Sequence, residues 1–293
     1  RALRSSSEYT ATVAIPSSRA ARMTRTAISP RLAIRIFFST GVYLAPMDFA
    51  DKNQPSPWRV NFVAETGSTN ADLMEEGLAG APDRTVLRAG FQSAGRGRLD
   101  RTWQAEPGEN LLVSFLFRPV PRDPHVLTQV VAMAARDVAR SVGVDAVMKW
   151  PNDLLVGTTK LAGVLAQAGP LEGDRPSFVV VGIGVNIASA PEAAASLRSS
   201  GWSREIEPAE FLDAMLPVID TLLALDEESM HAAYRAALAT IGAPVRVELP
   251  GDRFVTGRAV DVEPDGRLVV LDECAVTHRF DTADVVHLRP ASS

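Results

Sequence analysis

A ten-residue stretch, AGRGRLDRTW at 94–103, combines residue types that bind anions. Arg96, Arg98 and Arg101 lie close together in it, and glycines precede the first two of them, at Gly95 and Gly97. The planar guanidinium group of arginine matches the oxygens of a phosphate or carboxylate two at a time, and glycine lets the backbone approach a ligand closely. The stretch has neither helical nor strand periodicity, so it predicts a surface loop that binds an anion, above all a polyphosphate. A solvated basic loop is the alternative.

Two further polar clusters also follow predicted strands. Ser68-Thr69-Asn70 follows a strand predicted at 60–65, and the segment from Lys149 to Lys160 follows one predicted at 146–150. For Ser68 or Thr69 taken alone, the favoured interpretation is a cap on the helix that begins at 71. The coincidence of three polar clusters, each after a strand, favours a binding site over three unrelated features.

Several common sites are excluded by the sequence. The four histidines are scattered, which argues against a metal site built by the protein. No serine–histidine signature and no G-x-x-x-x-G-K-[ST] loop occurs. The single cysteine, Cys274, excludes an internal disulfide and fits a reducing compartment, so a cytoplasmic location is expected.

The charge distribution is uneven. The 293 residues carry a formal net charge of −5. Residues 1–46 hold seven arginines and one glutamate, so without them the charge falls to −11. An acidic body argues against general nucleic-acid binding, which needs a basic footprint. No apolar stretch reaches the roughly 20 residues of a membrane span, so no membrane partner is expected.

Residues 1–46 are rich in Arg, Ser, Thr and Ala, which predicts a disordered tail. Its composition is that of a transit peptide, and it also resembles translation from upstream of a natural start at Met47, the favoured interpretation. Residues 47–241 are predicted to form the main domain. Strands are predicted at 60–65, 85–92, 110–117, 146–150, 154–156, 161–166 and 178–185, and helices at 71–76, 124–142, 193–199, 208–225 and 229–239. Residues 110–117 are nearly all apolar, which predicts a strand buried on both faces.

At Gly242 the pattern changes to short alternating strands separated by Gly and Asp turns. They are predicted at 245–249, 254–262, 268–271, 276–280 and 285–288. Five short strands in about 48 residues predict a small closed or nearly closed β-barrel over 242–293.

Together these segments resemble the biotin protein ligases. The matching segments are GSTN at 67–70, QSAGRGRLDRTW at 92–103, KWPNDLLV at 149–156, KLAGVLAQ at 160–167 and GIGVN at 182–186. The likeness covers about residues 60–289 and includes the order and spacing of the segments. It implies an α+β fold: a mixed sheet with helices packed on it, of the class II synthetase or biotin–lipoate ligase type, and a C-terminal SH3-like barrel. The DNA-binding domain of the repressor members has no counterpart here, so a monofunctional ligase without a DNA partner is expected.

The resemblance implies that biotin and Mg-ATP form biotinyl-5′-AMP, and that the biotinyl group passes to one lysine of a biotin carboxyl carrier domain of an acyl-CoA carboxylase. A carboxylate must then approach a triphosphate, and cations must offset their repulsion. The loop at 93–104 is expected to be mobile without ligand and to close over the intermediate, excluding water. Either a monomer or a weak homodimer is expected.

Residue roles follow by the same resemblance. The biotin site comprises Ser68, Thr69, Asn70, Gln92, Gly95, Arg96, Gly97, Arg98, Lys160 and Gly163. The ATP site comprises Arg96, Arg98, Arg101, Trp103, Asn152, Lys160 and Asn186. Arg98 and Lys160 are catalytic through the charge they stabilise, and Asp153 orients or deprotonates the incoming lysine.

For some of these positions an alternative stays open. Trp103 either walls the adenine or anchors the loop, and Lys149 is either functional or one half of a structural ion pair. Gly163, Gly182 and Gly184 either leave room for the biotin rings or allow close packing. Trp150-Pro151 is interpreted as shaping its turn.

Two other functions compete with the biotin ligase. A lipoate or octanoate ligase or transferase of the same fold would attach a different acid to a similar lysine. The full GRGR loop and the C-terminal strands favour biotin over that alternative. An RNA-binding protein is the other alternative, and the acidic body argues against it.

Overall fold

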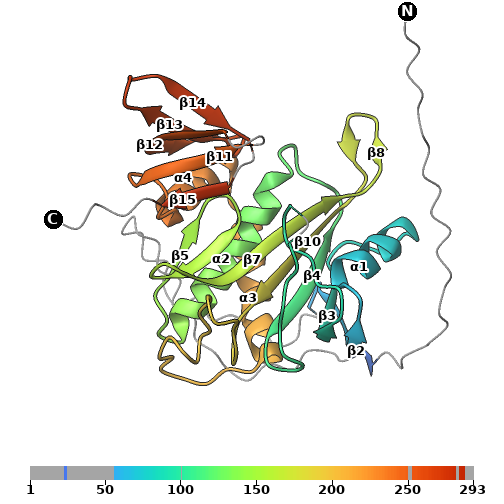
Figure 1. The fold of residues 1–293 in the computed structure, drawn as a ribbon. Helices are drawn as coiled ribbons and strands as arrows, with labels where there is room; N and C mark the ends of the chain where they lie inside the picture. The colour runs from blue at the N-terminus through green and yellow to red at the C-terminus, as the bar shows by residue number, and fades with distance from the viewer. Residues whose placement is uncertain (1–22, 25–55, 100, 250–252, 282–283, 288–293) are drawn as a thin grey trace, which may run out of the picture.

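Eight strands pair into one mixed sheet in the order β1-β2-β3-β4-β10-β7-β6-β5 (Figure 1). The structure is a computed structural model that describes residues 23–24, 56–99, 101–249, 253–281 and 284–287. Strands β2 and β3 run parallel, and the other described neighbours are antiparallel. The strands are β1 (Met23–Thr24), β2 (Arg59–Thr66), β3 (Thr85–Gln92), β4 (Leu111–Phe117), β5 (Ala146–Lys149), β6 (Asp153–Val156), β7 (Thr159–Ala168) and β10 (Val179–Val185). A two-stranded hairpin, β8 (Leu171–Glu172) with β9 (Arg175–Pro176), extends from β7.

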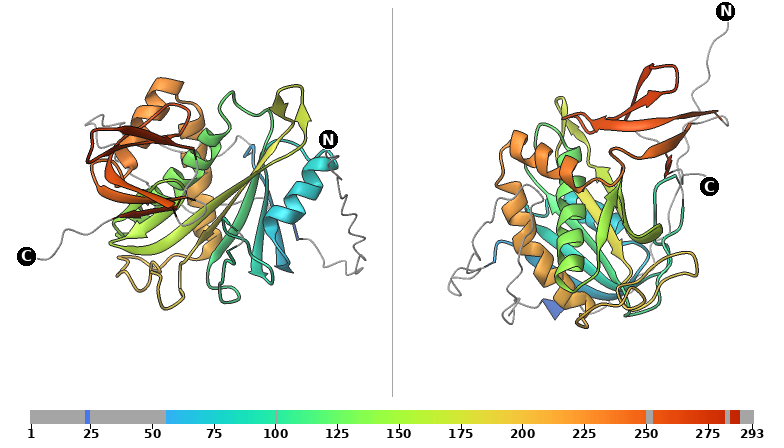
Figure 2. Two further views of the ribbon diagram at one scale, coloured as in Figure 1. Left: turned by 45° about the horizontal axis from the view of Figure 1, so that its top comes forward. Right: turned by 90° about the vertical axis from the view of Figure 1, so that its left-hand side faces the viewer.

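Helices cover both faces of this sheet. The helices α2 (His125–Ser141), α3 (Pro208–Leu223) and α4 (Glu227–Ala237) pack on one face, and α1 (Thr69–Leu78) packs on the other (Figure 2). Strand β4 shows why its run is apolar: Phe115 joins the larger core on the α2 side, whereas Leu116 joins Leu73 of α1 in the smaller one. This architecture confirms the predicted α+β fold. No helix within the described ranges is long and apolar enough to cross a membrane.

Small residues hollow the α1 face at the centre of the sheet. Because side chains alternate along a strand, Gly182 and Gly184 of β10 face the α1 side while Val181 and Ile183 enter the larger core. Gly182 lies opposite Ser114 of β4. This part of the face lies beyond α1, and the candidate site occupies it.

A second sheet follows α4, with the strand order β14-β13-β12-β11-β15. Its members are β11 (Pro244–Leu249), β12 (Arg253–Val262), β13 (Leu268–Asp272), β14 (Thr277–Phe280) and β15 (Asp284–His287). Five strands were predicted here, and all described pairs are antiparallel. Within the described residues β14 and β15 lie at opposite edges without pairing, so the predicted barrel is open. The predicted boundary at 241/242 falls between α4 and β11.

The predicted helix at 193–199 is wrong. These residues form turns, because their backbone groups bond to neighbouring strands instead of to one another. Ala195 N–H donates to the Lys160 carbonyl at 2.9 Å, and Leu197 N–H donates to the Asn186 carbonyl at 3.0 Å. The alanine-rich composition favours a helix locally, but these tertiary hydrogen bonds override that preference. Of the predicted tail at 1–46, only residues 23–24 lie among the described residues.

Candidate functional site

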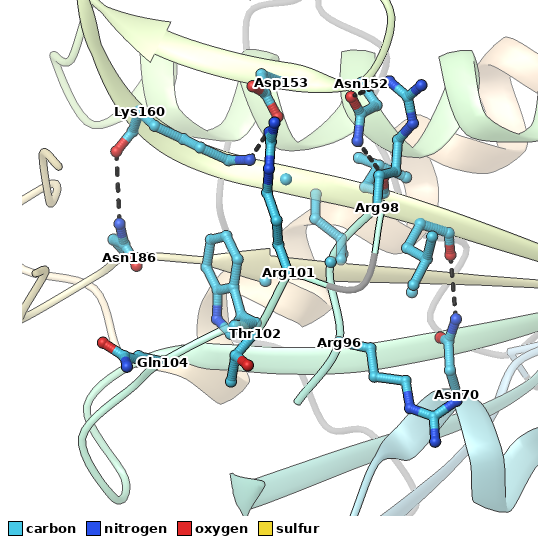
Figure 3. A pocket seen from close by; sticks show the side chains of 18 of the residues that line it. Asn70, Arg96, Arg98, Arg101, Thr102, Gln104, Asn152, Asp153, Lys160 and Asn186 are labelled. Atoms are coloured by element: carbon cyan, nitrogen blue, oxygen red, sulfur yellow. Dashed lines mark hydrogen bonds and ion pairs between the residues drawn. The ribbon is translucent and has the colours of Figure 1, made fainter. Parts of the chain in front are cut away.

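A cavity of about 400 Å³ opens on the hollowed face of the main sheet (Figure 3). Its walls combine the start of α1, the arginine loop, the β5–β6 turn, and strands β7 and β10. The C-terminal sheet adds Glu248 from β11 and Val285 from β15. The residues that the sequence marks for a site and that line it are Ser68, Thr69, Asn70, Gln92, Arg96, Gly97, Arg98, Arg101, Trp103, Asn152, Asp153, Lys160, Gly163 and Asn186.

One end of the cavity is a neutral hydrogen-bond network. Asn70 is 5% exposed, and its amide nitrogen donates to the Leu165 carbonyl at 3.1 Å and to Gln167 Oε1 at 2.9 Å. Its amide oxygen accepts from the Ser114 hydroxyl at 2.6 Å. The Ser114 hydroxyl also lies 2.7 Å from the Thr69 hydroxyl. Ser114 thereby fixes the orientation of two side chains that line the cavity.

Gln92 presents a defined group to the same end. Its Oε1 accepts from the Thr69 backbone N–H at 2.7 Å and from the Thr69 hydroxyl at 2.9 Å. The amide nitrogen of Gln92 is therefore the group left to face a ligand. Ser68 takes the N-cap position of α1, but its side chain makes no capping hydrogen bond. The position therefore agrees with the cap interpretation, whereas the hydrogen bond that a cap requires is absent from the described contacts of Ser68.

The arginine loop folds as a small hairpin. Arg96 pairs with Thr102 across it, and Gly97 N–H donates to the Arg101 carbonyl at 2.7 Å. Leu99, at the tip, takes a φ of 54°. Gly95 is not among the residues that line the cavity, and its carbonyl accepts from Trp103 N–H across the hairpin at 2.9 Å. A Cβ at Gly95 would lie 2.7 Å from the Trp103 carbonyl oxygen, so glycine here allows the two arms of the hairpin to close.

The other end of the cavity is cationic. Strands β6 and β7 form a hairpin that brings Lys160 Nζ to 2.6 Å from Asp153 Oδ1. Arg98 Nη1 donates to Asn152 Oδ1 at 3.2 Å, and Asn152 Nδ2 donates to the Val164 carbonyl at 2.7 Å. Figure 3 shows Lys160 and Arg98 directed toward these two consecutive residues. Two cations from distant segments are thus held by one turn of the chain.

The ring of Trp103 lies over the glycines of the sheet. A Cβ at Gly184 would lie 2.3 Å from its Cε2, and a Cβ at Gly163 would lie 3.3 Å from its Cζ3. The space beside Gly182 is filled by the Asn70 amide, whose oxygen would lie 2.1 Å from an added Cβ. In this structure the glycines make room for the side chains of the site itself. Three buried polar atoms of the cavity, Trp103 Nε1, Asn186 Oδ1 and Asp153 Oδ1, have no hydrogen-bond partner among the described residues. Of these, Asp153 Oδ1 has Lys160 as an ion-pair partner.

Asn186 also has a structural role. Its amide nitrogen donates to the Ala195 carbonyl at 3.0 Å and holds the 193–199 turns against β10. No group of three or more His, Cys, Asp or Glu side chains that could hold a metal occurs in the described residues.

Some residues of the site do not stand out in the sequence. Ser114 could have been identified from the sequence as a candidate, because it is the only polar residue within the apolar strand β4. Glu248 and Val285 have no such signal, since their alternation with neighbours is that of any half-buried strand. Their place at the cavity depends on how the C-terminal sheet docks.

Comparison with known families gives the class of protein first. Residues 64–186 match the model of the biotin/lipoate A/B protein ligase family. Residues 240–288 match the biotin protein ligase C-terminal domain. The first match spans the cavity segments from α1 to Asn186, and the second spans the C-terminal sheet.

Individual relatives narrow this class. The chain is 38% identical over 250 residues to a biotin–[acetyl-CoA-carboxylase] ligase of Mycobacterium tuberculosis, covering 80% of this chain and 91% of the relative. A protein of the same name from Paracoccus denitrificans is 33% identical, over 63% of this chain and 76% of the relative. The fold resembles that of an Aquifex aeolicus biotin protein ligase solved with biotin and ATP, with a TM-score of 0.66, 24% identity, and coverage of 79% and 99% of the two chains. This chain belongs to the biotin protein ligase family.

Proposed function

We propose that this protein joins biotin to ATP, forming biotinyl-5′-AMP and pyrophosphate, and then transfers the biotinyl group to a lysine of a biotin carboxyl carrier domain. The observation that supports this most is the division of one cavity into a neutral, directional end and a cationic end. Biotin has the same division, with an uncharged ureido ring at one end and a carboxylate at the other. The name of the Mycobacterium tuberculosis relative indicates acetyl-CoA carboxylase as the source of the carrier domain.

The neutral end binds the ureido ring. Gln92 offers its amide nitrogen to the ureido oxygen, and the hydroxyls of Ser68 and Thr69 supply further polar contacts. Asn70 shapes the pocket and has little part in binding biotin, because the nitrogen and the oxygen of its amide already have protein partners. An apolar ligand with a few directional polar contacts is what such pockets select.

Ser114→Ala is expected to raise the KM for biotin about fivefold and to leave turnover at saturating biotin nearly unchanged. The change removes one buried hydrogen bond, a loss of about 1 kcal/mol, from the network that orients Thr69 and Asn70. The measurement is pyrophosphate release against biotin concentration. Ser141→Ala is the control, because Ser141 donates to the Val138 carbonyl at the end of α2, away from the cavity.

An unchanged KM for biotin in Ser114→Ala, with a fall in thermal stability matched by Ser141→Ala, would show that the network has no part in binding.

The cationic end brings the two substrates together. Lys160 stabilises the negative charge that develops at the reacting carboxyl group, and Arg96, Arg98 and Arg101 contact the carboxylate and the phosphates. Mg²⁺ arrives with ATP and offsets charge on the leaving pyrophosphate. The carboxylate oxygen of biotin attacks the α-phosphorus, one phosphorus–oxygen bond breaks, and pyrophosphate leaves.

The base of ATP stacks against Trp103. Trp103 Nε1 and Asn186 Oδ1 are buried without a partner, which costs about 1–3 kcal/mol for each such group. One donor and one acceptor fit the hydrogen-bonding edge of adenine, and binding would give each a partner.

Transfer of the biotinyl group to the carrier involves Asp153, which follows the β5–β6 turn. Asp153 accepts a proton from the acceptor lysine, whose amine nitrogen then attacks the carbonyl carbon of biotinyl-AMP. The new carbon–nitrogen bond replaces the carbon–oxygen bond to phosphate, and AMP leaves.

The test is incubation of the protein with biotin, Mg-ATP and a carrier domain, followed by mass spectrometry of the carrier. We expect a biotin-sized mass gain that requires ATP and is absent when the acceptor lysine of the carrier is arginine. Parallel reactions with lipoate and octanoate test the related acids. Modification by lipoate in place of biotin would overturn the assignment of the substrate.

A further inference from the structure

Trp150 links the turn of the cationic end to the C-terminal sheet. It lies between β5 and β6 and is 2% exposed. Its backbone N–H donates to the Thr240 hydroxyl at 3.0 Å, and its indole Nε1 donates to the Gly266 carbonyl at 2.9 Å. Gly266 lies in the β12–β13 turn, 116 residues later in the chain. The indole bond therefore joins two segments that the sequence alone does not connect.

The acceptor of this bond is itself held in place. Gly266 takes a φ of +86°, and its N–H donates to the Glu263 carbonyl at 2.8 Å. On the other side of the turn, His125 Nε2 lies 2.9 Å from the Pro264 carbonyl oxygen, so this nitrogen carries the proton and donates. The β12–β13 turn is thus fixed within its own sheet and against the start of α2.

The other end of the link is the pair of residues that hold the cations. Two and three positions after Trp150, Asn152 accepts from Arg98 and Asp153 pairs with Lys160. Asn152 is also fixed to β7 by two hydrogen bonds with Val164. A shift of Trp150 would therefore move the anchors of Arg98 and Lys160 together.

We propose that Trp150 is a positioning residue for the nucleotide-dependent step. Its indole hydrogen bond to Gly266 lets the C-terminal sheet set the position of the turn that orients Lys160 and Arg98. The inference rests on the proposed function, and it gives the C-terminal sheet a role in forming biotinyl-AMP besides lining the cavity with Glu248 and Val285. Within the described part of the chain, the hydrogen bonds of Thr69, Asn70 and Gln92 do not reach this turn, so we expect the effect at the cationic end.

The test is Trp150→Phe, which keeps an aromatic ring but removes the indole N–H donor together with part of the ring volume; the control below removes the same volume. We expect the turnover of biotinyl-AMP formation to fall about tenfold, because small misplacements of catalytic groups are costly. The KM for biotin should rise by a much smaller factor, since the ureido contacts do not involve Trp150 and only the contacts to the carboxylate depend on the turn. Both values come from pyrophosphate release with Mg-ATP at varied biotin. A residue that only stabilised the fold would not separate turnover from KM in this way.

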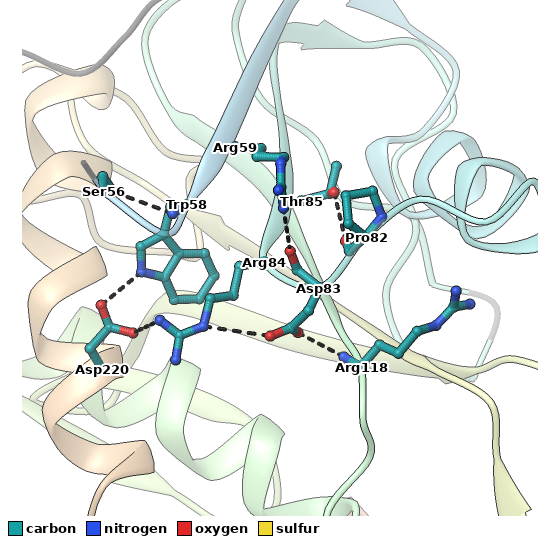
Figure 4. Close-up of polar contacts among 9 residues, drawn as sticks. All are labelled: Ser56, Trp58, Arg59, Pro82, Asp83, Arg84, Thr85, Arg118 and Asp220. Atoms are coloured by element: carbon teal, nitrogen blue, oxygen red, sulfur yellow. Dashed lines mark hydrogen bonds and ion pairs between the residues drawn. The ribbon is translucent and has the colours of Figure 1, made fainter. Parts of the chain in front are cut away.

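Trp58→Phe is the matched control. Trp58 is 6% exposed, and its indole donates to Asp220 Oδ2 at 3.0 Å on the α3 side of the sheet (Figure 4). Trp58→Phe also removes an indole nitrogen from a partly buried hydrogen bond, but neither Trp58 nor Asp220 lines the cavity. We expect a fall in melting temperature in both variants and altered turnover only in Trp150→Phe.

Gly266→Ala tests the link from the acceptor side. An alanine Cβ would lie 2.9 Å from His125 Cδ2 and would be strained at a positive φ, so either the turn that carries the Gly266 carbonyl or the His125 side chain bonded to that turn must shift. We expect the same loss of turnover with a much smaller rise in the KM for biotin, and little further loss in the double variant with Trp150→Phe. If Trp150→Phe does not fold, Gly266→Ala alone decides the question.

Wild-type turnover in Trp150→Phe or Gly266→Ala, or a parallel rise in the KM for biotin, would overturn the inference. Absence of biotinyl-AMP with the wild-type protein would instead count against the proposed function.

Discussion

Lys160→Ala will slow pyrophosphate release from biotin and Mg-ATP about 10²- to 10³-fold. The ammonium group lies at the cationic end of the cavity, where negative charge develops as the carboxylate attacks phosphorus. Loss of one preorganised group that stabilises such charge has this effect on catalytic rates in general. The free energy of unfolding should change by less than about 1 kcal/mol, because Lys160 is 39% exposed and exposed ion pairs contribute little.

Arg198→Ala is the control for Lys160→Ala. It removes a cation from an exposed pair with Glu205, at 3.4 Å, outside the cavity lining. Its rate should equal that of the wild type. Pyrophosphate release from Lys160→Ala within a factor of two of the wild-type rate would refute the assigned role.

Arg98→Ala will let biotinyl-AMP escape before transfer. Arg98 belongs to the arginine hairpin and bonds to Asn152 across the cavity, so its guanidinium both faces the ligand and holds the hairpin closed. A hydrogen bond to a charged group contributes about 1.5–3 kcal/mol, which corresponds to about 10- to 100-fold faster dissociation. The measurement is the fraction of radiolabelled intermediate that stays with the protein through rapid gel filtration.

Arg204→Ala should retain the intermediate as the wild type does, because Arg204 pairs with Glu210 away from the cavity. Equal retention by Arg98→Ala and Arg204→Ala would contradict the role of the hairpin in closing the site.

The strands and most helices could be predicted because their patterns reflect local geometry. Strand β3 was predicted at its observed bounds, and the unbroken apolar run of β4 indicated burial on both faces. The segment at 193–199 could not be predicted, because its hydrogen bonds come from Lys160 and Asn186. Local propensity has no information about partners in distant strands.

The candidate site was predictable in composition and less so in arrangement. Motif residues such as Arg98 and Asp153 do line the cavity. The sequence did not predict that Asn70 already has partners for both amide groups. Nor did it indicate that Trp150, interpreted as shaping its turn, donates to Gly266 in the second sheet. The Asn70 contacts depend on how α1 packs on the main sheet, and the Trp150 contact depends on how the two sheets dock. No single segment encodes either arrangement.

The ammonium of Lys160 has a carboxylate partner within the protein, Asp153, at 2.6 Å. Any molecule that uses this cation must therefore compete with Asp153 for it. An acid can compete, because it brings a full negative charge of its own. An alcohol or amide of the same shape cannot, so it fills the pocket without gaining this interaction. Discrimination against uncharged analogues then requires no steric barrier, because the Asp153 carboxylate competes with every ligand for the Lys160 ammonium.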